Sequence, residues 1–147
     1  MFEKFLRGLL APSPAPLPET EARLALTALL VRVARADHHY SEPEVDRIDR
    51  VLMQRYGLSP FEAAKLRVEA ETLESEAPDT VRFTRALKEA VPIEERTALM
   101  QALWSVALAD GDRASEEEQL LRMVARLLGL TDPENALARQ RAARGAE

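Results

Sequence analysis

The chain has 147 residues, of which 46% are hydrophobic and 31% are charged. This length is sufficient for one compact domain with its own hydrophobic core. The formal charge of -5 has the wrong sign for a protein that binds nucleic acid through the phosphate backbone. The chain contains no cysteine, which excludes disulfides, thiolate metal sites and a thiol nucleophile.

The first 18 residues differ in character from the rest. Residues 1–10 carry apolar side chains at helical spacing, which predicts a short amphipathic helix that docks on this protein, on a protein partner or on a membrane surface. Residues 11–18 contain four prolines at alternating positions and are typical of an extended linker. We therefore expect the folded domain to occupy residues 19–147. No membrane-spanning run or signal peptide is present, which favours a cytoplasmic protein.

From residue 19 onward, apolar residues recur at intervals of three and four, as they do in amphipathic α-helices. The stripes lie over 26–33, 45–52, 61–73, 83–91, 99–107 and 120–128. A last helix is expected after Pro133. The sequence thus predicts an all-α, compact bundle of about seven helices after the amphipathic segment.

Helix boundaries are marked by local signals. Capping boxes, in which Ser or Thr precedes a helix and Glu follows three residues later, occur at Ser41/Glu44, Ser59/Glu62, Ser115/Glu118 and Thr131/Glu134. Gly57 and Gly129 stand where a residue with positive φ would close a helix. Pro78 and Pro92 mark two further breaks.

Part of the chain is repeated. Ala36-Asp37 matches Ala109-Asp110, and Glu44 matches Glu117 at the same separation along the chain. The match extends through the apolar stripes to the Gly-Leu pairs that follow them. The sequence therefore predicts two duplicated helix-loop-helix units with a helical insert between them.

Residues 33–44 and 106–117 resemble the tellurite-resistance TerB-like family. The marks of the family are an Ala-Asp-Gly turn at the end of one helix, an acidic residue seven positions later, and an apolar stripe that leads to Gly-Leu; the second segment has all of them, and the first has histidine in place of the glycine. The resemblance covers about residues 19–129. It implies a compact helical domain with duplicated acidic units, a divalent-metal-binding role, and an association with tellurite resistance and other stress responses.

The family pattern selects four metal ligands in this chain: Asp37, Glu44, Asp110 and Glu117. His38, Asp112 and Glu118 are secondary candidates. The chain departs from the family at His38, where glycine is common, and this puts a symmetrical pair of sites in doubt.

The residues themselves also single out the two aspartates. Asp37 and Asp110 each continue a core-facing apolar stripe, and an inward carboxylate needs a cation, a metal ion or several hydrogen-bond donors. Two interpretations stay open. The aspartates either bind metal or accept hydrogen bonds from the amides of the following helix, and Glu44 has a competing role in its capping box.

These patterns lead to one main hypothesis and two alternatives. The main hypothesis is a non-enzymatic module that binds a divalent metal ion, with no catalytic residue and no organic cofactor. The first alternative is a metal-free protein-protein interaction scaffold, recruited through residues 1–10 or through a groove between the repeats. The second is a metallohydrolase that uses carboxylates alone. The sequence does not determine the metal, the partner or the oligomeric state.

Two other features have plainer interpretations. The acidic run Glu69, Glu71, Glu74, Glu76 and Asp79 contains no basic residue and is expected to form a solvated helix face. Trp104 lies beside an apolar stripe and is expected in the core or a groove.

Overall fold

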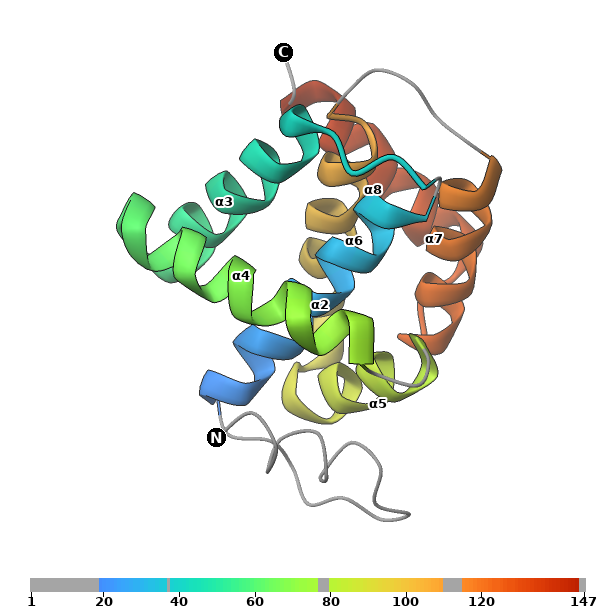
Figure 1. Ribbon diagram of the computed structural model, residues 1–147. Helices are drawn as coiled ribbons and strands as arrows, with labels where there is room; N and C mark the ends of the chain where they lie inside the picture. The colour runs from blue at the N-terminus through green and yellow to red at the C-terminus, as the bar shows by residue number, and fades with distance from the viewer. Residues whose placement is uncertain (1–18, 37, 77–79, 110–114, 146–147) are drawn as a thin grey trace.

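The computed structural model describes residues 19–36, 38–76, 80–109 and 115–145. Over these ranges the chain forms seven helices and no strand, in the arrangement shown in Figure 1. They are α2 (Glu19–Arg35), α3 (Glu42–Tyr56), α4 (Pro60–Glu76), α5 (Thr80–Ala90), α6 (Ile93–Ala107), α7 (Ser115–Leu127) and α8 (Asp132–Gly145). The predicted all-α fold and its number of helices are confirmed, whereas the amphipathic segment and linker over 1–18 lie outside the described residues.

Helix α2 is the central helix of the bundle. Every residue from Leu24 to Val31 is buried, and α2 contacts α3, α4, α5, α6 and α7. A helix that is apolar on all sides must be covered on all sides. Its one polar residue in this stretch, Thr27, donates its hydroxyl hydrogen to the Arg23 carbonyl oxygen at 2.7 Å, so the core accommodates it within the helix.

Helix α6 is the second buried helix, and it packs against α2, α3, α7 and α8. Trp104 is 3% exposed, and its indole N–H donates to Asn135 Oδ1 at 2.8 Å. The Arg139 guanidinium lies over the indole ring, 5.0 Å from its centroid. The predicted interior position of Trp104 is confirmed, with both polar contacts supplied by α8.

No helix in the described ranges is both long enough and apolar enough to cross a membrane.

Three of the predicted capping boxes are formed. Ser41, Ser59 and Thr131 each accept a hydrogen bond from the backbone N–H of the glutamate three residues later. Each of these glutamates accepts one from the backbone N–H of its capping residue. This backbone hydrogen bond lowers the pKa of Glu62 and Glu134 below the ordinary value of 4.5. Helix α7 begins at Ser115 itself rather than after it.

Positive φ angles occur where helices end. Gly57 (φ 65°) and Gly129 (φ 81°) have the left-handed conformation that their positions predicted. His38 also has a positive φ, 65°, just beyond the end of α2. Glycine, which the sequence resemblance gives as common at this position, suits such a conformation, because an L-residue there carries a steric cost that glycine lacks.

The acidic run on α4 is not a uniformly solvated face. Glu74 accepts from Arg32 Nε at 3.1 Å and from Arg35 Nη1 at 2.7 Å, and its side chain is 13% exposed. Glu69 and Glu76 are exposed, as expected, and Asp79 lies outside the described residues. The prediction was wrong at Glu74 because its basic partners come from α2, which is distant in sequence.

Glu71 is the second exception in this run. It accepts from the Tyr40 hydroxyl at 2.6 Å and from Arg67 Nη1 at 3.0 Å. Arg67 also donates to Asp49 Oδ1 on α3 at 2.7 Å. Burial, followed by the hydrogen bond and the charge of Glu71, raises the pKa of Tyr40 well above 10. The phenol therefore stays protonated near neutral pH and joins the loop before α3 to α4.

Replacing Glu74 should weaken the contact between α2 and α4. We expect Glu74→Gln to lower the free energy of unfolding by about 1–3 kcal/mol, because two half-buried arginines lose a charged hydrogen-bond acceptor. Glu76→Gln is the matched control on the exposed side of α4, and its effect should stay within about 0.5 kcal/mol. Urea unfolding of both variants measures the difference, and equal effects would contradict the pairing.

His38 offers a test of the turn after α2. Glycine there should raise the free energy of unfolding by about 0.5–1 kcal/mol, because relief of the left-handed backbone outweighs the larger entropy of the unfolded glycine chain. His38→Val should lower it, since a β-branched residue is disfavoured at positive φ. Thermal unfolding of both variants checks the ranking, and the reverse order would contradict the observed turn.

Candidate functional site

Two of the four primary candidates, Glu44 and Glu117, lie in the described part of the chain. Glu44 is the third residue of α3, and Glu117 is the third residue of α7. Both are almost fully buried, with exposed fractions of 0% and 1%. Glutamate is rarely buried to this extent unless a partner compensates its charge. The sequence match between these residues thus corresponds to the same helix position and the same depth.

The surroundings of Glu44 are set by the capping box. Its Oε1 accepts from the Ser41 backbone N–H at 3.1 Å and from the Ser41 hydroxyl at 3.0 Å. Ser41 has an extended backbone, with φ -80° and ψ 158°, which is usual for the residue before a helix. The carboxylate is therefore held in one orientation at the start of α3, and the capping role expected from the sequence is confirmed.

The helices that carry the two glutamates begin at the same end of the bundle. In Figure 1, the start of α3 and the start of α7 both lie at the top, close to the level where α2 and α6 end. Contacts join α2 to α7 and α3 to α6. Each helix that bears a buried glutamate therefore packs against the first helix of the other predicted unit.

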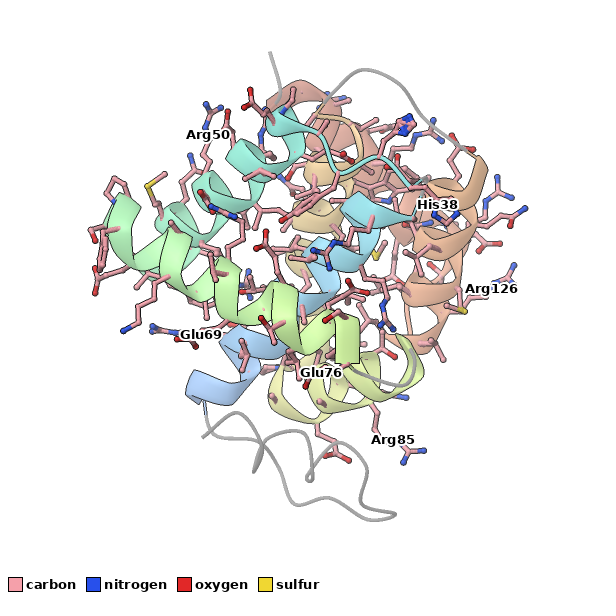
Figure 2. All side chains as sticks on the ribbon, viewed as in Figure 1. His38, Arg50, Glu69, Glu76, Arg85 and Arg126 are labelled. Carbon is pink, nitrogen blue, oxygen red and sulfur yellow. The ribbon has the colours of Figure 1, made fainter. Side chains whose placement is uncertain are left out.

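The remaining candidates do not complete a site within the described residues. Asp37, Asp110 and Asp112 lie outside them. His38 is exposed, and it projects at the end of α2 in Figure 2. Glu118 is 33% exposed and pairs with Arg139 Nη2 at 3.5 Å. Across the described ranges, no three His, Asp or Glu side chains lie close enough together to hold a metal ion.

A basic groove was missed by the sequence analysis. Arg47, Arg50 and Arg55 of α3 line a cavity of about 410 Å³ that α6 and α8 complete. A signal was present in the sequence, because Arg47 and Arg50 recur at the spacing of one helix face. The groove could not be found from that spacing alone, since its other sides come from α6 and α8, which are distant in the sequence.

The family of the chain follows from comparison with known proteins. The family model of the tellurite resistance protein TerB matches residues 23–140, a range that includes all of α3 to α7 and most of α2 and α8. Neither curated proteins nor solved structures give a match. The family match agrees with the resemblance carried by the two acidic units. The chain belongs to the TerB family of tellurite resistance proteins.

Proposed function

We propose that this chain is a non-enzymatic, cytoplasmic module that binds a divalent cation through carboxylates at the starts of α3 and α7. One observation carries the proposal: Glu44 and Glu117 occupy the same position in their helices and are equally buried. Buried carboxylates at matching helix positions are the type of oxygen donor that a hard divalent cation takes in proteins.

The donor chemistry favours a hard cation. Carboxylate oxygens suit calcium, magnesium and manganese, whereas a soft metal would require the thiolates that this chain lacks. Asp37 and Asp110 are the further ligands that we propose, one ahead of each glutamate. The capping box accounts for the orientation of Glu44 and is compatible with metal binding, because a carboxylate has two oxygens.

We also propose that the two acidic units arose by duplication. Each contains two helices, and the second helix has a buried glutamate as its third residue. Each second helix is followed by a glycine at positive φ, Gly57 or Gly129. The family's association with tellurite resistance supports a role in stress responses, and the cation would then be a structural or regulatory ligand.

Calorimetric titration tests the proposal. Chelator-treated protein is titrated with calcium, magnesium, manganese and zinc, and we expect saturable binding of at least one of the first three. Glu44→Gln/Glu117→Gln should weaken that binding about tenfold or more, because glutamine keeps the volume and loses the charge. The matched control is Glu69→Gln/Glu76→Gln, which removes two exposed charges from α4 (Figure 2) and should leave the affinity unchanged.

Thermal unfolding with and without the bound cation provides a second readout. The cation should raise the unfolding temperature of the wild type, because it binds the folded state alone, and this increase should be lost in Glu44→Gln/Glu117→Gln. A folded wild type that binds none of the four metals would overturn the proposal and favour the metal-free interaction scaffold. Equal losses in the control variant would show that general negative charge, and no defined site, attracts the cation.

A further inference from the structure

The basic groove is separate from the buried glutamates and has its own geometry. It runs between α3 and α6, and α8 closes it at one side. Its cavity of about 410 Å³ lies in the range of small-molecule sites. Arg50 marks this face of the protein in Figure 2, at the edge of α3 far from Arg85 on α5.

The side chains that line the groove differ in length, because those from α6 and α8 are mostly small whereas those from α3 are mostly long. Helix α6 contributes Ala98, Ala102 and Ser105, which share one helix face by their spacing. At the α8 side the lining residues are Ala142 and Gly145. These short side chains leave room in front of α3, and Arg47, Arg50 and Arg55 of α3 line that space.

The charged residues that line the groove are all positive. Its described lining contains three arginines and no acidic residue, although the whole chain carries a formal charge of -5. Within the described ranges, Arg47 and Arg50 form no ion pair, whereas the nearby Asp49 is engaged by Arg67. Like charges one turn apart on a helix repel each other. An anion between them would remove that repulsion.

The chemistry of the lining favours an oxyanion with several oxygens. Guanidinium groups are planar and match the oxygens of phosphate, as they do those of carboxylate, through paired hydrogen bonds. Gln54 and Gln101 add amide donors on opposite sides of the groove. Val51 and Ala102 offer apolar surface to a small organic part of a ligand. A long polyanion is disfavoured, since the protein as a whole is negatively charged.

We propose that this groove binds a small phosphate anion with more than one negative charge, of the diphosphate class. The site is independent of the cation site proposed above, because none of its residues is a proposed metal ligand. The arginines of α3 hold the phosphate groups, and the small residues of α6 and α8 leave the room that the anion occupies.

Titration with inorganic pyrophosphate tests this inference on the full chain without added metal. Two-dimensional NMR should show saturable shifts of amide signals in α3 and α6. Arg47→Gln/Arg50→Gln should weaken binding about tenfold or more. Ala98→Leu should weaken it similarly, because the larger side chain fills the groove at an exposed position without a change of charge. Lys65→Gln/Arg85→Gln removes the same number of positive charges from exposed sites on α4 and α5 and should have no effect.

Three results would overturn the inference. The first is the absence of saturable pyrophosphate binding by the folded wild type. The second is an equal loss in Lys65→Gln/Arg85→Gln, which would show attraction by general charge rather than by the groove. The third is binding to vesicles that contain anionic phospholipid but not to free pyrophosphate, which would make this face a membrane contact. Circular dichroism confirms that each variant is folded.

Discussion

The other helices of the bundle are arranged around the buried middle of α2. From Leu24 to Val31 no residue of this helix is more than 9% exposed, so other helices must cover it on every side. Helices α3 to α7 do so. The charged residues Arg32 and Arg35 follow this stretch, and Glu74 of α4 pairs with both. The position of α4 is therefore determined by apolar burial along α2 and by ion pairing at its end.

Two kinds of hydrogen bond stabilise the ends of the helices, and they differ in the sequence separation of the residues that they join. Capping boxes at Ser41, Ser59 and Thr131 use residues three positions apart, so they begin a helix regardless of what packs around it. Arg96 acts over a longer range. It donates to the carbonyl oxygens of Lys88, Val91 and Leu128, which joins the end of α5 to the end of α7.

The two proposed sites use residues of opposite charge on α3. Glu44 in its first turn is buried with its carboxylate held by Ser41, whereas Arg47 and Arg50 one to two turns later line an open groove. Burial separates them, because Glu44 is enclosed at the start of the helix and the two arginines line the groove further along it. A cation and a phosphate anion would thus bind the same helix at different positions, in a family associated with tellurite resistance.

The helices, three of their capped starts, the glycines at positive φ and the family could be predicted from the sequence, and so could the matching positions of Glu44 and Glu117. These features depend on residues close together in the chain or on a motif that recurs within it. The pairing of Glu74 with Arg32 and Arg35, the hydrogen bond from Trp104 to Asn135 and the basic groove between α3 and α6 could be seen in the folded structure alone. Such contacts depend on how helices pack, and packing is the sum of many side-chain contacts that no local pattern specifies.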